Sequence, residues 1–572
     1  MRFNIHDVPF SRHGSYTAIS YDRQHGADRN TLYWRCVHGD ALWRSNRIFR
    51  IEVLKNGRPA VFTPIATPSH LRLKTPHGSV EFVMPDNNLV RVRGTGVSLR
   101  LTCGKEMEPL AQPARQGQWE INATRRRVKY MLTPLRGAVH VDAPWLLTDY
   151  FHHRCPHVTI TLSAGSGERF FESAIEEFES EWEKRSYRKS FSRCIYGVDK
   201  EFSAWKKKLP KVPAGHAKTA ELAAYVMWSA VVAPSGTLKR PAMLMSKNWM
   251  IQVWAWDNCF NAWALAFRNP AAAWDQFMIN FDRQHAQGSL ADSVSDRAES
   301  LSFVKPPVHG WVLAKLLAAN RSLAGTSRLR EIYGPLCRWT EWWLTYRDTN
   351  GDGLPEYKHG NDSGWDNCTL FEAGTPVEGP DLSAYLVLQM ETLATVAGKL
   401  GRKREARQWM RKSKTLQKRL IRFLWNGERF VAPRLPDCHC VESDSLLAYL
   451  PIVLGKRLPP EIRTKLVAGL KRRGLFLTRW GLATESPESP RYIPDGYWRG
   501  PIWAPSTLVI VDGLWSCGEH ALARTIARRF LKLVAKSGMA ENFDAVTGRG
   551  LRDPAYTWTP SVFFILARHY AR

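Results

Sequence analysis

The stretch GYWRGPIWAPSTLVIVDGL, Gly496 to Leu514, places three aromatic residues around an arginine and a proline, directly before an apolar run of helical length. Flat aromatic faces beside a few polar groups suit the C–H faces of a sugar ring. The same pattern is also typical of a tryptophan-rich corner of a core. Two more segments combine tryptophan, carboxylate and amide next to helical patterns: NWMIQVWAWDNCFNAWALAF (Asn248 to Phe267) and YKHGNDSGWDNCTLF (Tyr357 to Phe371). Together the three segments indicate a carbohydrate-processing enzyme.

The composition is that of a globular protein with more than one domain. The chain has 572 residues, 44% hydrophobic and 23% charged, so two large domains are expected. It lacks an apolar run of about eighteen residues, so no membrane span is expected. The N-terminal segment lacks an apolar signal region, which favours a cytoplasmic protein, although a chain trimmed of its signal would look the same. The ten cysteines lack disulfide-framework spacing and fit reduced thiols.

The net charge of +28 is strongly basic. It is compatible with a nucleic acid, an anionic membrane or an acidic saccharide as a partner. The largest basic run, Gly401 to Trp425, also carries apolar residues at helical spacing and so predicts a surface helix with a solvated basic face. No nucleic-acid-binding motif accompanies this run, so no nucleic-acid partner is expected.

Residues 1–165 predict an antiparallel β-sandwich. Short alternating segments recur between turn residues, among them RIFRIEVLKNG, LVRVRGTGVSLRLT and HVTITLSAG. The charged segment from Glu168 to Phe191 has the pattern of an amphipathic helix, and a Pro/Gly joint follows from Lys207 to His216. Residues 166–216 are therefore expected to form a helical linker between two domains.

From residue 217 to 572 the pattern is helical. About twelve helices are expected, near 218–232, 257–268, 270–285, 306–320, 327–347, 380–399, 402–425, 442–451, 459–473, 502–517, 519–537 and 559–571. Because no strands alternate with them, they predict a toroid of six helix pairs, although no repeat of fixed period accompanies the pattern. The tryptophan and carboxylate segments fall in its loops, where function is usually placed on a rigid scaffold.

Four motifs carry a resemblance to a known family: WAWDNCF (from Trp254), SGWDN (from Ser363), YWRGPIW (from Tyr497), and ENFDAVTG (from Glu541) followed by YTWTP. In their order and rough spacing the chain resembles the inverting α-glycosidases of glycoside hydrolase family 63 and their trehalase relatives, over about residues 217–572. The resemblance implies a β-sandwich followed by an (α/α)6 barrel. It also implies exo-acting hydrolysis of an α-linked glucoside or related α-glycoside, with no required cofactor.

The resemblance implies a pair of catalytic carboxyl groups. Asp366, in SGWDN, would be the general acid, and Glu541, which opens ENFDAVTG, would be the general base. In an inverting enzyme such groups stand roughly 6.5–9.5 Å apart to leave room for a water molecule. Trp365 would supply part of the apolar wall that keeps the acid protonated. Taken without the resemblance, Asp366 is also a suitable helix cap and Glu541 an ordinary polar residue.

Other motif residues are expected to surround the sugar. The resemblance implies that Trp256 and Asp257 bind the sugar at the bond that is cleaved. The indole would stack on the sugar ring, and the carboxylate would accept hydrogen bonds from its hydroxyls. Arg499 either contacts substrate or orients a carboxylate, or it forms a structural ion pair. The rest of the expected lining consists of Trp254, Tyr497, Trp498, Trp503, Tyr556 and Trp558.

Lys305 departs from the family pattern. Relatives often carry a glutamine before a Pro-Pro pair, whereas here Lys305 precedes Pro306 and Pro307. A cation in place of a neutral amide near the substrate indicates an acidic or otherwise different sugar substrate.

The segment DTNGDGLPE, Asp348 to Glu356, resembles the start of a calcium loop, with Asp348, Asn350 and Asp352 at alternate positions. His359 at the twelfth position excludes an EF-hand. One interpretation is a structural calcium bound by these three residues, and the other is a turn rich in Asx residues.

Two further functions remain open. An inverting glycoside phosphorylase would use phosphate in place of water, which suits Lys305, but it would not need Glu541 as a base. A non-catalytic saccharide or polyanion binder would suit the net charge, but the presence of both carboxylates argues against it.

Overall fold

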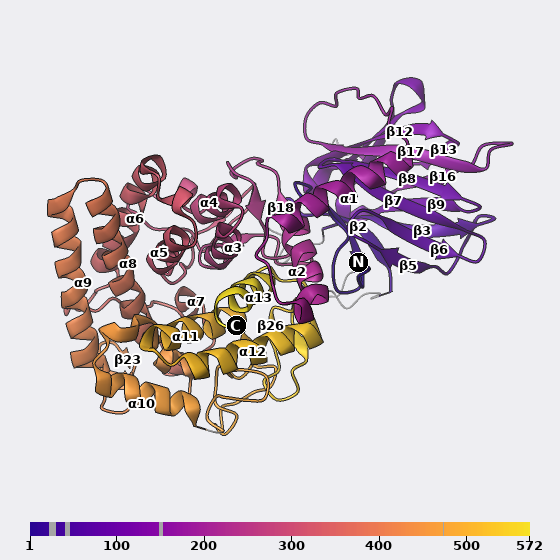
Figure 1. Cartoon of the computed structure of the whole chain (residues 1–572). Helices are drawn as coiled ribbons and strands as arrows, with labels where there is room; N and C mark the ends of the chain where they lie inside the picture. The colour runs from indigo at the N-terminus through magenta and orange to yellow at the C-terminus, as the bar shows by residue number, and fades with distance from the viewer. Residues whose placement is uncertain (22–29, 40–45, 148–152, 473, 572) are drawn as a thin grey trace. The chain divides into compact units, whose positions relative to one another are not determined.

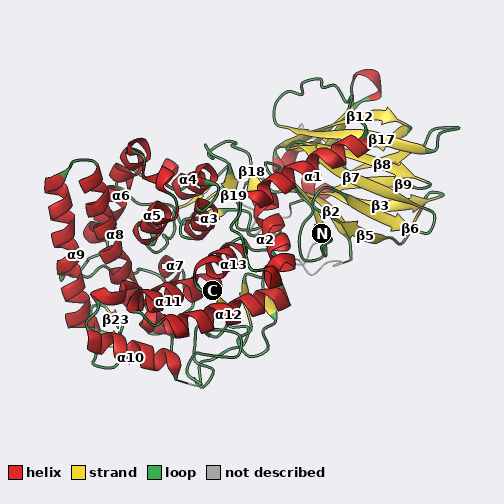
Figure 2. Cartoon of the chain, in the orientation of Figure 1, coloured by secondary structure: helices red, strands yellow, loops and turns green. Residues whose placement is uncertain are grey.

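The computed structural model describes residues 1–21, 30–39, 46–147, 153–472 and 474–571, which form two compact units (Figure 1). One unit comprises Met1–Lys207 together with Ala224–Ala233 and Ser246–Ile251, and it contains almost all the long strands (Figure 2). The other comprises Lys208–Ala223, Pro234–Met245 and Gln252–Arg572, and it is mainly helical.

The first unit is built from two antiparallel sheets, which confirms the predicted β-sandwich. In the order of pairing, one sheet consists of β1 (Thr17–Tyr21), β2 (Leu32–Cys36), β3 (Arg47–Lys55), β9 (Ser98–Gly104), β16 (His157–Ser163) and β13 (Ala138–Asp142), with β4 (Arg58–Pro59) paired to β3. The other consists of β10 (Pro109–Pro113), β11 (Trp119–Ala123), β12 (Val128–Arg136), β17 (Phe170–Phe178), β8 (Leu89–Thr95), β7 (Gly78–Asp86), β6 (Leu71–Thr75) and β5 (Thr63–Ala66).

Period-two alternation explains how these sheets make one core. In β6, Leu71 and Leu73 are fully buried, whereas Arg72 and Lys74 between them are exposed. Successive side chains of a strand point to opposite faces, so this strand buries one face only. Apolar residues of both sheets belong to a single buried cluster.

The helix predicted from Glu168 to Phe191 is wrong: strand β17 takes its first half, and residues 179–190 are irregular. β17 lies between β12 and β8, inside the sheet. Its acidic residues are paired: Glu172 bonds to Arg91 on β8, and Glu177 lies 3.1 Å from a ring nitrogen of His38. These partners are distant in the chain, so sheet pairing overrode the local helical pattern. The helix in this region is α1 (Phe191–Lys207), and the predicted helical linker is a strand followed by an irregular segment and α1.

The helical unit contains a closed ring of six inner elements, which confirms the predicted (α/α)6 barrel. They are α3 (Asp257–Ala266), α5 (His309–Ala319), α8 (Pro380–Lys399), the 3-10 helix η8 (Leu446–Arg457), α11 (Ala504–Cys517) and α13 (Trp558–His569). Each packs on the next, and α13 packs on α3. Outer helices alternate with them along the chain: α4 (Pro270–Met278), α6 (Thr326–Tyr346), α9 (Lys403–Leu424), α10 (Pro460–Lys471) and α12 (His520–Ser537). The one-turn α7 (Gly360–Ser363) also belongs to this unit, whereas α2 (Ala217–Ala230) has residues in both units.

Burial distinguishes the two layers. In α11 every residue from Ala504 to Leu514 is buried, as expected for a helix that is apolar all round. In α9 only one stripe is buried, formed by Trp409, Ser413, Leu416, Leu420 and Leu424. The remaining strands are two-residue pieces in the loops: β14 (Leu146–Leu147), β15 (His153–Arg154), β18 (Val231–Val232), β19 (Ala242–Met243), β20 (Val253–Trp254), β21 (Ser293–Val294), β22 (Glu299–Ser300), β23 (Pro433–Arg434), β24 (His439–Cys440), β25 (Ile502–Trp503), β26 (Asn542–Phe543) and β27 (Gly550–Leu551).

Over the described ranges, none of the helices combines the length and the apolarity that crossing a bilayer would need.

Asp512 joins three parts of the ring. This buried carboxylate on α11 accepts hydrogen bonds from the Trp311 indole at 2.7 Å and the Tyr570 hydroxyl at 2.7 Å, and it pairs with the Lys315 ammonium at 2.5 Å. Trp311 and Lys315 lie on α5, and Tyr570 directly follows α13. Replacing the shared carboxylate would leave all three donors without this acceptor.

The substitution Asp512→Ala should therefore lower the free energy of unfolding of the helical unit by about 2–4 kcal/mol, since it leaves two buried donors and the partly exposed Lys315 ammonium without their acceptor. Thermal and urea unfolding of the purified protein would measure it. Lys471→Gln is the matched control, because it breaks the exposed Lys471–Glu519 pair at 2.9 Å and should cost less than about 1 kcal/mol. Equal effects of the two substitutions would contradict the assigned role of Asp512.

Candidate active site

The motif segments meet because of the direction of the inner helices. An outer helix separates each inner element from the next, so the inner elements run parallel and their N-terminal ends lie at one end of the ring. WAWDNCF runs into α3, Lys305 precedes α5, SGWDN precedes α8, YWRGPIW runs into α11, and YTWTP runs into α13. Five segments far apart in the sequence are thus delivered to the same end.

Four tryptophans form a closed ring of contacts, here called the tryptophan ring. Trp498 stacks on Trp503 with centroids 3.9 Å apart and planes at 6°. Trp503 meets Trp558 edge-on at 5.3 Å, and Trp256 lies 6.1 Å from both Trp498 and Trp558. Trp365 joins at 4.8 Å from Trp498. All five are at most 3% exposed, so they form a packed layer that carries the polar groups of the site.

Asn367 fixes the YWRGPIW loop to the SGWDN segment. Its side-chain amide donates to the Gly496 carbonyl at 3.0 Å, and its side-chain oxygen accepts from the Trp498 backbone N–H at 2.9 Å. Between these two residues, Tyr497 has a φ of 64°, which is unusual for a bulky residue. The Trp503 indole donates to the Tyr497 carbonyl at 2.8 Å and helps to hold this conformation.

Asp257 is the first residue of α3 and is buried. Its carboxylate accepts a hydrogen bond from the Tyr556 hydroxyl at 2.8 Å, which joins the WAWDNCF and YTWTP segments. Burial raises the pKa of Asp257 to about 7, and the charges of Asp292 and Asp366 add to this effect. Tyr556 in turn packs on Trp558, with ring centroids 4.4 Å apart.

Glu541 is also buried, on a segment paired with the YWRGPIW loop. The strand β26 follows it directly and pairs with β25, which places Asn542 opposite Trp503. The backbone N–H of Glu541 donates to the Asp553 carbonyl at 2.7 Å, and the Trp558 indole donates to the Glu541 carbonyl at 2.9 Å. Burial, followed by the nearby charge of Asp553, raises the pKa of Glu541 to about 8.

Lys305 lies among carboxylates. Its ammonium pairs with Asp292 at 2.9 Å, donates to the Asn361 carbonyl at 2.8 Å, and lies 3.8 Å from the Asp366 carboxylate. Burial lowers the pKa of Lys305, but the carboxylates of Asp366 and Asp292 raise it by more. The pKa of Lys305 is therefore raised overall. The Lys305 side chain is 6% exposed and that of Asp366 27%. Of this pair, Asp366 is the group open to solvent.

The pKa of Tyr497 is affected by three carboxyl groups of the site. Burial raises its pKa, and the charges of Asp366, Glu541 and Asp257 raise it further. The charges of three carboxyl groups, from three separate loops, thus raise the pKa of one hydroxyl. The structure brings together Asp257, Asp366 and Glu541 with Lys305 and the tryptophan ring.

Two expected lining residues are placed differently. Arg499 forms an ion pair with Glu372 at 2.7 Å, and Glu372 is shared with Arg491 at the same distance. This arrangement matches the structural alternative for Arg499. Trp254 lies in β20, opposite Ser293, and is 8% exposed. It makes no ring contact with the tryptophan ring in the described part of the chain.

The segment proposed to bind calcium is a turn held by its own hydrogen bonds. The amide of Asn350 donates to the carboxylates of Asp352 and Glu378, both at 3.0 Å. Burial and the nearby Asp352 raise the pKa of Glu378 to about 8. No three acidic side chains of this turn, as far as the structure describes it, converge as metal ligands do. These contacts match the Asx-turn alternative, and a calcium ion bound by Asp348, Asn350 and Asp352 stays a prediction.

Three residues of the site are absent from the sequence-based expectations. Asp292 holds Lys305, Asn367 joins two loops, and Asp553 lies beside Glu541. Asn367 belongs to SGWDN, so its motif was a usable signal. Asp292 and Asp553 act through partners brought close by folding, and their local sequence carries no comparable signal.

Comparison with known proteins agrees with this geometry. The model of the mannosylglycerate hydrolase MGH1-like glycoside hydrolase domain matches residues 250–559. Mannosylglycerate hydrolase from Thermus thermophilus is 29% identical over 120 residues, which is 21% of this chain and 28% of that protein. Mannosylglycerate hydrolase MGH1 from Selaginella moellendorffii is 21% identical over 388 residues, 54% of this chain and 78% of that protein.

Solved structures show the same fold. The GH63 mannosylglycerate hydrolase from Thermus thermophilus, in complex with Tris and D-glycerate, has a TM-score of 0.52 and 20% identity over 60% of this chain and 99% of that one. A bacterial glucoamylase complexed with acarbose has a TM-score of 0.59 and 9% identity over 98% of this chain and 93% of that one. The predicted resemblance to glycoside hydrolase family 63 is confirmed: the family model covers more than half of the sequence, and the chain belongs to the MGH1-like glycoside hydrolases.

Proposed function

We propose that the chain is an inverting, exo-acting hydrolase of a small α-glycoside, with Asp366 as general acid and Glu541 as general base. One observation carries this proposal: the tryptophan ring joins the three loops that bear these two groups and Asp257. Trp365 and Trp256, the chain neighbours of Asp366 and Asp257, both pack on Trp498, and the Trp558 indole donates to the Glu541 carbonyl. An inverting glycosidase needs two carboxyl groups that flank the bond to be cleaved. The tryptophan ring next to them supplies apolar surface for a sugar.

The chemistry balances with these two groups. Asp366 gives its proton to the glycosidic oxygen as the bond from that oxygen to the anomeric carbon breaks. A water molecule attacks the anomeric carbon from the opposite face and gives a proton to Glu541. Asp366 ends ionised, Glu541 ends protonated, and the released sugar has the inverted anomeric configuration. Asp257, already hydrogen-bonded to Tyr556, would accept from sugar hydroxyls.

The substrate class follows from the neighbours of the acid. A general acid stands at the glycosidic oxygen, so the groups beside it face the aglycone. Beside Asp366 lies the Lys305 ammonium, at 3.8 Å. A cation in this position suits an aglycone with a carboxylate, and the relatives from Thermus thermophilus and Selaginella moellendorffii are named for mannosylglycerate. We therefore propose an α-glycoside of a small hydroxy acid, such as mannosylglycerate.

Inversion is the direct test of the proposal. Mannosylglycerate should release β-mannose first, without added phosphate, and proton NMR of the anomeric signals in the first minutes would record it. Asp366→Asn should lower turnover by at least about 100-fold, because general acid catalysis contributes roughly 10²–10⁴-fold. Early release of the α-anomer would refute Glu541 as a base. A strict need for phosphate would make the protein a phosphorylase instead.

The pKa of Glu541 sets a second prediction. A base must be ionised, and burial with Asp553 raises the pKa of this group to about 8. In the free enzyme kcat/KM should therefore rise with pH up to about 8. Asp553→Asn removes a like charge, which lowers the pKa of Glu541, so the rising limb should move to lower pH. A pH profile of kcat/KM for both proteins measures this. An unmoved limb would show that another group controls it.

Lys305→Gln tests the hydroxy-acid aglycone. The readout is the ratio of kcat/KM for mannosylglycerate to that for the matching neutral mannosylglycerol, since this ratio cancels general losses of chemistry. The ratio should fall about 10- to 100-fold, as expected for one charge-assisted hydrogen bond. Asp292→Asn is the control, because it leaves the cation in place and should preserve the preference for the anion. An unchanged ratio in Lys305→Gln would contradict the assignment.

A further inference from the structure

The outer helix α9 carries a straight row of cations. Its exposed face presents the six residues Arg404, Arg407, Arg411, Lys414, Lys418 and Arg422. At 100° per residue these positions fall within an arc of about 80°, and at 1.5 Å per residue they extend over about 27 Å. The buried stripe of α9 lies on the opposite side of the helix. The helix forms an outer edge of the helical unit (Figure 1).

The charge of this row is not neutralised within the protein. None of its six side chains has a carboxylate within ion-pair distance among the residues that the structure describes, whereas neighbouring Lys412, outside the row, pairs with Glu341 at 2.6 Å. Row members stand three or four positions apart, where like charges on a helix repel one another. A helix face with several positive charges that no carboxylate of the described residues neutralises is suited to binding an external polyanion.

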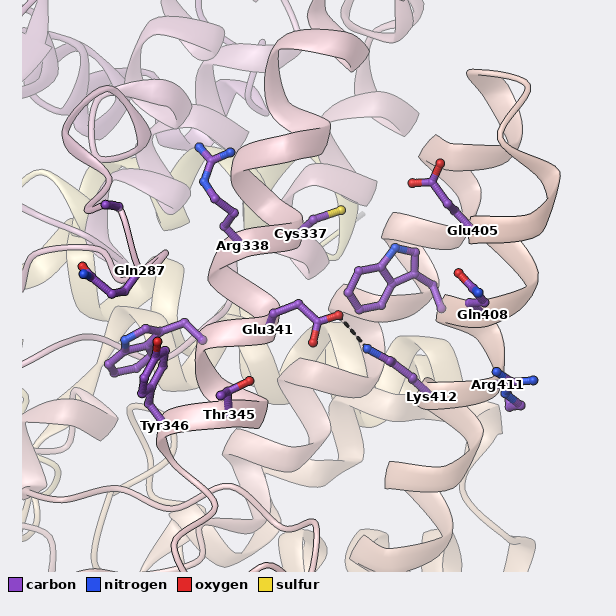
Figure 3. Close-up of a pocket in the computed structure, with 13 residues that line it drawn as sticks. Gln287, Cys337, Arg338, Glu341, Thr345, Tyr346, Glu405, Gln408, Arg411 and Lys412 are labelled. Carbon is purple, nitrogen blue, oxygen red and sulfur yellow. Dashed lines mark hydrogen bonds and ion pairs between the residues drawn. The ribbon is translucent and has the colours of Figure 1, made fainter.

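A hollow of about 640 Å³ lies beside the row, between α6 and α9 (Figure 3). Its lining includes three aromatic side chains, the amides of two glutamines, two carboxylates and three cations: Trp342, Tyr346, Trp409, Gln287, Gln408, Glu341, Glu405, Arg338, Arg411 and Lys412. Tyr346 is 49% exposed and lies 6.3 Å from the Trp342 ring. Arg411 lines this hollow and also a second one of about 400 Å³ along the row, so the two hollows are neighbours.

The lining distinguishes between classes of polyanion. Carboxylates and amides beside aromatic rings suit the hydroxyl groups and C–H faces of sugars. Glu341 and Glu405 are already paired with Lys412 and Arg402, and their oxygens can accept hydrogen bonds from sugar hydroxyls, which the phosphate groups of a nucleic-acid backbone cannot donate. A membrane-inserting face would need several exposed apolar residues, and the outer face of α9 offers Phe423 near its end, 50% exposed. A sugar polymer with carboxylate groups satisfies both the row and the hollow.

We propose that α9 and the adjoining hollow bind an acidic polysaccharide of the uronate class. Its carboxylates would meet the cationic row, and its sugar rings would lie against Tyr346 and Trp342. This surface lies on the outer layer of the barrel and shares no residue with the candidate active site, so the inference does not depend on the proposed hydrolysis.

The test compares two variants of the full chain with equal loss of charge. The row variant combines Arg407→Gln, Arg411→Gln, Lys414→Gln and Lys418→Gln. The control variant combines Lys207→Gln, Lys208→Gln, Lys211→Gln and Lys218→Gln, which are exposed lysines outside α9. Binding of fluorescently labelled alginate oligosaccharides at low and high salt should weaken about tenfold or more in the row variant, since each exposed pair contributes little alone. The control should stay within about twofold. Melting temperatures of both variants check the fold.

A third variant, Tyr346→Ala, separates sugar recognition from charge. It should weaken alginate binding several-fold and leave the binding of polyphosphate unchanged, because only the sugar stacks on the ring. Single-stranded DNA and phosphatidylserine vesicles serve as competing probes. The proposal is wrong if DNA or the vesicles bind more tightly than alginate and lose this affinity in the row variant. It is also wrong if the row and control variants show equal losses of affinity for alginate.

Discussion

The site depends on the closure of the inner ring. Six helical elements contact one another in a circle, and the outer helices between them force all six to run in one direction. The loops that precede them therefore gather at one end, whatever their separation in the sequence. Asp257, Asp366 and Glu541 act on one tyrosine hydroxyl for this reason. The buried network around Asp512 holds three members of the circle together at the level of single hydrogen bonds.

The candidate site contains buried carboxyl groups together with a buried cation, Lys305. The carboxyl groups of Asp366, Asp292 and Asp257 all raise the pKa of the buried Lys305 ammonium. The pKa of Glu541 is raised to about 8 and that of Asp257 to about 7, so the two groups retain protons near neutral pH. The sequence-based assignment placed the proton on Asp366 and left Glu541 ionised. The structure shows that burial gives the proposed base a high proton affinity before substrate binds. Catalysis by the proposed route therefore begins with proton loss from Glu541.

Prediction from the sequence was more accurate for the helices of the barrel than for the strands of the sheet. The helix predicted at 502–517 is α11, because a largely apolar run, a proline in its first turn and Gly518 after its end all agree. The segment from Glu168 failed because its acidic residues find arginine and histidine partners only in the folded sheet. The motif residues of the site were found because tryptophan and carboxylate cluster in short segments. Asp292 and Asp553 were missed because their partners, Lys305 and Glu541, become neighbours only through folding.

The starts of the inner helices have one more electrical consequence. Within the described residues, α3, α5, α8, α11 and α13 all begin without a hydrogen bond from a capping side chain. The first N–H groups of a helix carry the positive end of its macrodipole. Five such ends lie on the side of the ring where the carboxyl groups gather. The backbone itself thus supplies a positive potential that offsets the mutual repulsion of these carboxylates. The five helices lack the stabilisation of a capping side chain, which contributes about 0.5–2 kcal/mol to each helix that has one.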